Sequence, residues 1–177
     1  MTGDGIMERP SIRELLALQA RERAHPTPPA ALRDLFADES VSLDAKAMVL
    51  SMSWVHSGLW PLRLLPRREW IAMFESVGYL VNALRHEEMR PTEPLVLYRG
   101  AVHRYRRGLS WTKYESAARY YTGRFPGRPA HVYQITAEPS WLLAQVWNPF
   151  LPETGQFIVN VPKHAALRII PPAEGAR

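Results

Sequence analysis

The sequence lacks cysteine altogether, over a length of 177 residues. Disulfide bonds, thiolate metal sites and thiol nucleophiles are therefore excluded. The sequence also has no apolar run of the ~18 residues that a transmembrane helix needs. It does not start with a charged segment followed by an apolar one. The sequence accordingly predicts neither a membrane span nor a signal peptide, and we expect a soluble, cytoplasmic protein with no membrane partner.

Several patterns typical of catalytic or metal-binding proteins are absent as well. The sequence has no Gly-rich phosphate loop and no Gly-x-Ser-x-Gly nucleophile motif. Its six histidines are scattered without the spacing of metal ligands. They are His25, His56, His86, His103, His131 and His164. We therefore expect no metal cofactor.

Negative charge is scarce in one stretch of the chain. The formal net charge is +5, and residues 99–128 contain eight basic side chains but a single acid, Glu115. The bases are Arg99, Arg104, Arg106, Arg107, Lys113, Arg119, Arg124 and Arg128. Such a stretch attracts anions, either the phosphates of a dinucleotide or a nucleic acid backbone. A solvated surface loop around residues 104–107 is the simpler alternative.

The first ninety residues are predicted to form a helical N-terminal region, residues 1–90. Ser11 begins a capping-box pattern for a first helix, which should end before the breaker cluster at residues 25–29. A second short helix has Leu32 and Leu35 on one face. The Met and Trp residues of this region are interpreted as core filling.

Two more helices follow in the same region. Ser42 is placed to cap the third helix, and Pro66 to begin the fourth, which Gly78 should end. The fourth helix is expected to bury Trp70 and its apolar neighbours at helical spacing. Residues 79–89 fit either a continued helix or an irregular bridge.

After Pro94 the pattern changes to short apolar runs separated by turns, which favours strands. The first strand is expected to be opened by Pro94 and stopped by Gly100. The predicted strands are 95–98, 130–136, 141–146, 157–161 and 166–170, with one short helix at 114–121. Helices followed by strands predict an α+β protein, with a mixed or mainly antiparallel sheet in a core domain of residues 91–177.

Three motifs occur in order in this core. They are Tyr98-Arg99-Gly100, Arg107-Gly108-Leu109-Ser110-Trp111-Thr112 and Ala117-Ala118-Arg119-Tyr120-Tyr121. A guanidinium at the end of a buried strand needs anionic or carbonyl partners, so Arg99 is either paired structurally or available to a ligand.

Taken together, these motifs resemble the ADP-ribosyltransferase fold, in the subgroup whose signature is an arginine strand, a Ser-centred strand and a glutamate strand. The resemblance covers residues 94–162. It implies a split β-sheet core, NAD as the substrate, and cleavage of the bond between nicotinamide and ribose. The ADP-ribose would pass to a protein, a nucleic acid, a small molecule or water.

The resemblance also implies roles for individual residues in binding NAD. Arg99, beside Gly100, would bind phosphate or ribose oxygens. Ser110 would hydrogen-bond the catalytic acceptor, flanked by Trp111 and by Thr112, which supports the strand. Tyr121, or its neighbour Tyr120, would stack on the nicotinamide ring.

The chain departs from the family pattern at the catalytic glutamate. The residue immediately before the late apolar strand is Gln156, and the nearest acid, Glu153, lies three positions earlier in a predicted loop at 151–155. A carboxamide accepts a hydrogen bond from a ribose hydroxyl but does not stabilise a developing cation as a carboxylate does. The catalytic candidates are therefore Gln156, Glu153 and Ser110, and activity stays open.

Two other functions remain in view. One is an inactive module of the same fold that binds NAD, a nucleotide or a partner protein. The other is a nucleic-acid-binding protein that uses the basic stretch 99–128 and its interleaved aromatic residues. Each site residue also has a purely structural alternative. Arg99 would then pair with a glutamate of the helical region, Ser110 and Thr112 would be ordinary strand residues, and Trp111, Tyr120 and Tyr121 would be core residues.

Overall fold

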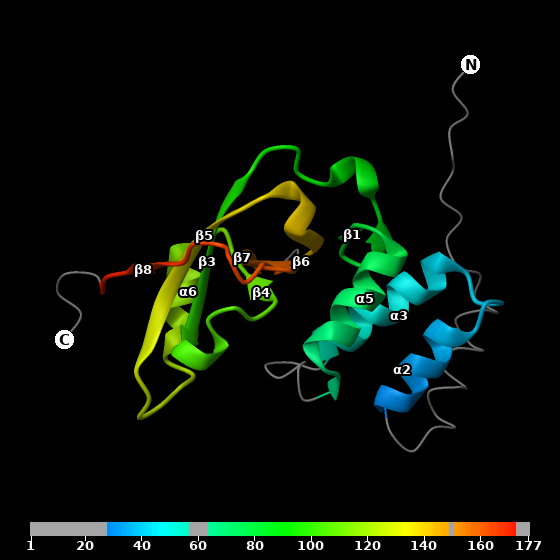
Figure 1. Ribbon diagram of the computed structural model, residues 1–177, viewed down its shortest axis with the longest axis horizontal. Helices are drawn as coiled ribbons and strands as arrows, with labels where there is room; N and C mark the ends of the chain where they lie inside the picture. Colours follow the sequence, from blue (N-terminus) through cyan, green and yellow to red (C-terminus); the bar gives the residue numbers. More distant parts are fainter. Residues whose placement is uncertain (1–27, 57–63, 149–150, 173–177) are drawn as a thin grey trace. The chain divides into compact units, whose positions relative to one another are not determined.

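The computed structural model describes residues 28–56, 64–148 and 151–172 (Figure 1). The helix expected from Ser11 lies outside these residues. The chain divides into two compact units, Met1–Arg85 and His86–Arg177, where the sequence analysis places the division after residue 90. Each unit is described by itself.

Three helices and a hairpin make up the described part of the first unit. The helices are α2 (Pro28–Ala37), α3 (Leu43–His56) and α5 (Arg67–Val77). The hairpin joins β1 (Leu80–Val81) to β2 (Leu84–Arg85). Residues 80–85, which the sequence left open, thus form strands, and Asn82 supplies the positive φ of 56° that a two-residue turn requires.

The helix boundaries of the first unit confirm the capping residues read from the sequence. The Ser42 hydroxyl accepts a hydrogen bond from the Ala45 amide at 3.2 Å, which caps the N-terminus of α3. Pro66 is the N-cap of α5, and Gly78 follows its last turn with a φ of 83°. The aromatic rings of Trp54 and Trp70 meet edge to face with centroids 5.0 Å apart, within the buried core.

The second unit contains two sheets and one helix. One sheet has the order β3-β5-β8, with β3 at Leu95–Val102, β5 at Ala130–Ala137 and β8 at Arg168–Ile170. In the other, β7 (Leu151–Val159) lies between β6 (Leu142–Asn148) and β4 (Ser110–Trp111). Every pairing among these strands is antiparallel. Short 3-10 turns at Glu87–Met89, His103–Tyr105 and Pro139–Trp141 complete the unit.

The helix α6 (Glu115–Thr122) packs on β3 and β5, and Figure 1 shows it alongside these strands. This packing explains Gly100, which the sequence analysis took as the end of the first strand. That expectation is wrong, because β3 continues to Val102. A Cβ on Gly100 would lie 1.9 Å from the carbonyl oxygen of Ala118, so the glycine allows the backbones of strand and helix to touch.

Helices in the first unit and antiparallel sheets in the second make this an α+β protein. The two sheets of the second unit supply most of its core, including Leu97, Ile135, Leu142, Phe157 and Ile158, all nearly inaccessible to solvent. Within the described ranges, no helix is long and apolar enough to cross a membrane.

Candidate functional site

The arginine strand and the Ser-Trp-Thr strand lie side by side. Tyr98 and Thr112 form a bridge in which the Tyr98 amide donates to the Thr112 carbonyl at 2.7 Å and the Thr112 amide donates back at 2.9 Å. The structure thus brings the first two sequence motifs together at a junction between β3 and β4, one strand from each sheet.

The Arg99 guanidinium makes two hydrogen bonds at this junction. Its Nε donates to the Tyr105 carbonyl at 3.0 Å and its Nη1 to the Ser110 carbonyl at 2.7 Å. The carbonyl partners expected for this side chain are therefore present, and no glutamate among the described residues pairs with it. Burial lowers the pKa of Arg99 to about 10, which leaves the group charged at neutral pH.

The third nitrogen of the guanidinium, Nη2, lies next to Gly108. Arg99 is only partly buried, and its Nη2 has no hydrogen-bond partner among the residues that the structure describes. A Cβ on Gly108 would lie 2.3 Å from this nitrogen, so a side chain at position 108 would displace the guanidinium. The sequence motif contained Gly108 without giving it a role. Its role could have been suspected from its position in the motif, two residues before Ser110.

The Gly108 backbone is itself fixed. The Trp111 indole Nε1 donates to the Gly108 carbonyl at 2.8 Å. Trp111 is 1% exposed and serves as a core anchor rather than as a ligand contact. Thr112 is also buried, and its hydroxyl oxygen accepts a hydrogen bond from the Tyr114 amide at 3.1 Å, just before α6.

Ser110 and Gln156 lie on one face of the second sheet. Ser110 pairs with Ile158 across β4 and β7, and Gln156 precedes Ile158 by two residues in a regular stretch of β7. Diagonal neighbours of this kind are roughly 7–8 Å apart. Both side chains are half-buried, and neither has a hydrogen-bond partner within the described part of the chain. Two polar side chains thus lie on the same face of this sheet.

Glu153 is located in β7, so the predicted loop at residues 151–155 is wrong. Val146 pairs with Gln156 and Asn148 with Leu151, so a step of two residues along β6 corresponds to five along β7. Glu153 lies in this irregular stretch. Strand irregularities of this type change the direction of side chains and are frequent beside active sites.

The two tyrosines of the third motif lie at the end of α6. Tyr121 is half-buried, and Tyr120 is 72% exposed, which excludes a core role for Tyr120. Their rings contact each other edge to face at 5.9 Å and share the Arg124 guanidinium. The site residues on β3, β4 and β7 are therefore brought together by strand pairing, whereas these tyrosines belong to a helix that packs on β3 and β5.

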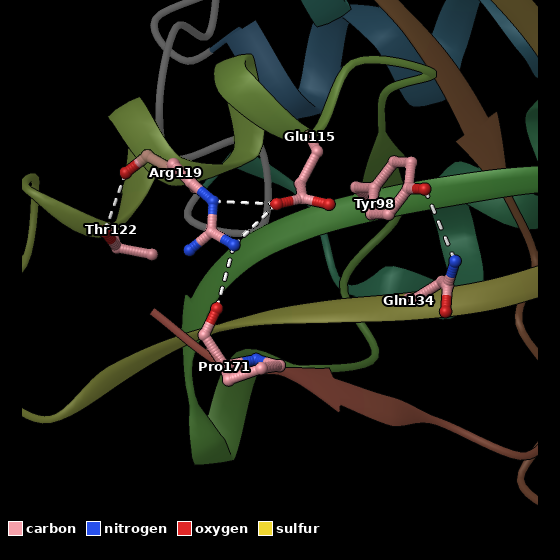
Figure 2. A network of polar contacts seen from close by, with 6 residues as sticks. All are labelled: Tyr98, Glu115, Arg119, Thr122, Gln134 and Pro171. Atoms are coloured by element: carbon pink, nitrogen blue, oxygen red, sulfur yellow. Dashed lines mark hydrogen bonds and ion pairs between the residues drawn. The ribbon is translucent and has the colours of Figure 1, made fainter. Parts of the chain in front are cut away.

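Two other bases of the basic stretch, Arg107 and Arg119, are bound by groups of the protein itself. Arg107 is structural, because it donates to the carbonyls of Pro162 at 2.5 Å and Ala165 at 2.7 Å, and burial together with Arg106 lowers its pKa. Figure 2 shows that Arg119 is also bound: it contacts Glu115 at 2.8 Å and the Pro171 carbonyl at 2.8 Å. Nearby, Gln134 donates to the Tyr98 hydroxyl at 3.3 Å.

Within the described residues, no group of three His, Asp or Glu side chains is placed to hold a metal ion. No protein-family model, curated protein or solved structure matches the chain.

Proposed function

We propose that this protein binds NAD as an ADP-ribosyltransferase-like protein, with the site formed by Arg99, Ser110 and Gln156. The observation that carries the proposal is that Arg99 Nη2 and the Ser110 hydroxyl, on adjacent strands, have no hydrogen-bond partner among the described residues. A permanently charged guanidinium with a free donor suits a phosphate oxygen. Three strands carry these residues, and their arrangement supports the proposal: β4 pairs with β7, and the isolated bridge of Tyr98 and Thr112 joins β3 to the residue after β4.

The chemistry of this site depends on what replaces the missing glutamate. Cleavage of the nicotinamide–ribose bond develops positive charge on the sugar, which a nearby carboxylate stabilises. Gln156 binds a ribose hydroxyl but provides no charge. Glu153, in the irregular stretch of β7, is the candidate acid. Transfer of ADP-ribose to an acceptor requires that acid, and without it the protein binds NAD and releases it unchanged.

The test is titration calorimetry with NAD, followed by an assay for free nicotinamide in the same sample. Saturable binding with nicotinamide release supports an active transferase or hydrolase, and Glu153→Gln should then stop the release. Binding without release supports the inactive NAD-binding module. Absence of any binding heat would overturn the proposal in both forms.

A matched pair of serine variants locates the site. Ser110→Ala removes the hydroxyl beside Arg99 and should weaken NAD binding about 2- to 10-fold, the loss of one hydrogen bond. Ser116→Ala removes an exposed hydroxyl from α6 and should leave the affinity unchanged. Equal affinities of the two variants would contradict the placement of NAD at Ser110.

A further inference from the structure

The end of α6 and the turn after it expose aromatic rings that are stacked with arginines. Tyr120 is 72% exposed, although a large aromatic side chain is normally buried. The Arg124 guanidinium lies 4.1 Å from the centroid of the Tyr121 ring and 5.5 Å from that of Tyr120. A guanidinium stacked in this way keeps its in-plane N–H donors available for an anion.

A second stack adjoins the first. The Arg104 guanidinium lies 4.4 Å from the centroid of the Tyr105 ring, and this ring lies 6.4 Å from the ring of Phe125. Phe125 follows Arg124 directly in the chain. The ring contact therefore connects the loop after β3 with the turn after α6, so the two arginine–aromatic stacks lie on neighbouring segments. We call this the stacked surface: Arg104, Tyr105, Tyr120, Tyr121, Arg124 and Phe125.

The stacked surface has positive charge that no acid neutralises. Two members of this surface, Arg104 and Arg124, are exposed, and so is Arg128, whose amide donates to the Phe125 carbonyl in the adjoining turn. No carboxylate of the described chain pairs with any of these three arginines. Glu115, the single acid of residues 99–128, is bound to Arg119 on α6 (Figure 2). The surface therefore presents unpaired guanidinium groups of the described chain near the exposed ring of Tyr120.

We propose that the stacked surface binds single-stranded nucleic acid. Phosphates would contact Arg104, Arg124 and Arg128, and an unpaired base would stack on the exposed ring of Tyr120. Proteins that bind single strands without sequence preference use positive charges for the phosphates and exposed aromatic rings for the bases. A base in a duplex has both faces covered by its neighbours, so the open Tyr120 ring favours the single strand. The binding does not depend on the proposed NAD site.

The experiment is fluorescence anisotropy of a labelled single-stranded RNA and its DNA equivalent, each of about 16 nucleotides, with the full chain and without NAD. We expect binding whose logarithmic affinity falls linearly with the logarithm of salt between about 50 and 200 mM. The matched duplex should bind more weakly than the single strand. Vesicles with phosphatidylglycerol serve as an anionic surface without bases.

Two pairs of variants separate stacking from charge. Tyr120→Ala should weaken binding about 5- to 100-fold through loss of one stacked base, whereas Tyr120→Phe, which keeps the ring, should bind like the wild type. Arg124→Gln should lower the salt slope by about 0.7, the value for one phosphate contact on a single strand. Arg68→Gln removes an exposed charge from α5 and should leave the slope unchanged.

Three results would overturn the inference. They are no binding at low salt, unchanged binding by both Tyr120→Ala and Arg124→Gln, or binding to the vesicles but not to the oligonucleotides. Because Tyr120 is 72% exposed, its substitution leaves the core intact, and circular dichroism verifies the fold of each variant. Anisotropy with Ser110→Ala, expected to bind the oligonucleotide like the wild type, keeps this result separate from that of the NAD site.

Discussion

Arg99 and Ser110 are joined by a 2.7 Å hydrogen bond from the guanidinium Nη1 to the Ser110 carbonyl oxygen. The contact links β3 of one sheet to β4 of the other, beside the reciprocal backbone bridge of Tyr98 and Thr112. Arg99 therefore has a structural role, and the proposed NAD site gives its third nitrogen a second one. Predictions for this residue must separate the two roles.

Substitution of Arg99 tests the structural role. Arg99→Ala leaves the carbonyls of Tyr105 and Ser110 without their donor, and we expect it to lower the free energy of unfolding by about 2–3 kcal/mol. Arg99→Lys keeps the charge but cannot reach both carbonyls with a planar fork, so its loss should be smaller. Urea unfolding measures both values. Equal stability of wild type and Arg99→Ala would contradict a structural role.

Gly100 tests the close approach of β3 and α6. Gly100→Ala would place a Cβ 1.9 Å from the Ala118 carbonyl oxygen, a backbone atom that cannot rotate away. We expect a loss of about 3 kcal/mol in the free energy of unfolding. Gly123→Ala is the matched control, because its Cβ would meet nothing closer than 3.4 Å. If Gly100→Ala is as stable as that control, α6 does not pack on β3 as described.

Gln156 tests the chemistry of the proposed site. Gln156→Glu places a carboxylate at the position of the family's glutamate, and we expect faster nicotinamide release from NAD because the charge stabilises the developing sugar cation. In the double variant Gln156→Glu/Ser110→Ala, nicotinamide release should be no faster than in the wild type. Release that is no faster in Gln156→Glu would indicate that this end of β7 is not the catalytic element.

Tyr133 gives a stability prediction that depends on pH. Burial raises the pKa of its phenol, whose hydroxyl has no partner among the described residues. The folded state therefore holds the proton more tightly than the unfolded state, and stability should fall as the pH rises above about 10. Tyr133→Phe should remove this fall and, at neutral pH, stabilise the protein by about 1 kcal/mol.

A second tyrosine is the control for this change. The Tyr98 hydroxyl accepts a hydrogen bond from Gln134, so Tyr98→Phe should destabilise the protein by about 1 kcal/mol. Urea unfolding at pH 7 and above pH 10 compares the two variants. The account of Tyr133 would be wrong if its replacement by Phe destabilised the protein as much as that of Tyr98.

Local chemistry made part of the fold predictable from the sequence. Ser42, Pro66 and Gly78 marked helix ends because capping depends on a few adjacent residues. The change from helical periodicity to short apolar runs after Pro94 predicted the change from helices to strands, although the β1–β2 hairpin already lies within the region predicted as helical. The need of Arg99 for carbonyl or anionic partners also followed from its chemistry, and carbonyls are what it binds.

Features set by contacts between distant segments were not predictable. Gly100 looked like a strand end, since the sequence did not reveal that a helix would pass against it. Residues 151–155 have a proline, a glycine and polar side chains, so their pairing in β7 depends on β6 rather than on their own pattern. For the same reason Gly108 received no role, because its importance comes from a guanidinium nine residues earlier.

The most direct test of the account is NAD titration of the Gly108→Ala variant beside the wild type. The added Cβ would lie 2.3 Å from Arg99 Nη2 and must push the guanidinium away from its place, without removing a polar group of the site. We expect saturable NAD binding by the wild type and by Gly123→Ala, and at least a tenfold loss (about 1.4 kcal/mol) in Gly108→Ala. Equal NAD affinity of Gly108→Ala and wild type would contradict the assignment of Arg99 to the NAD site.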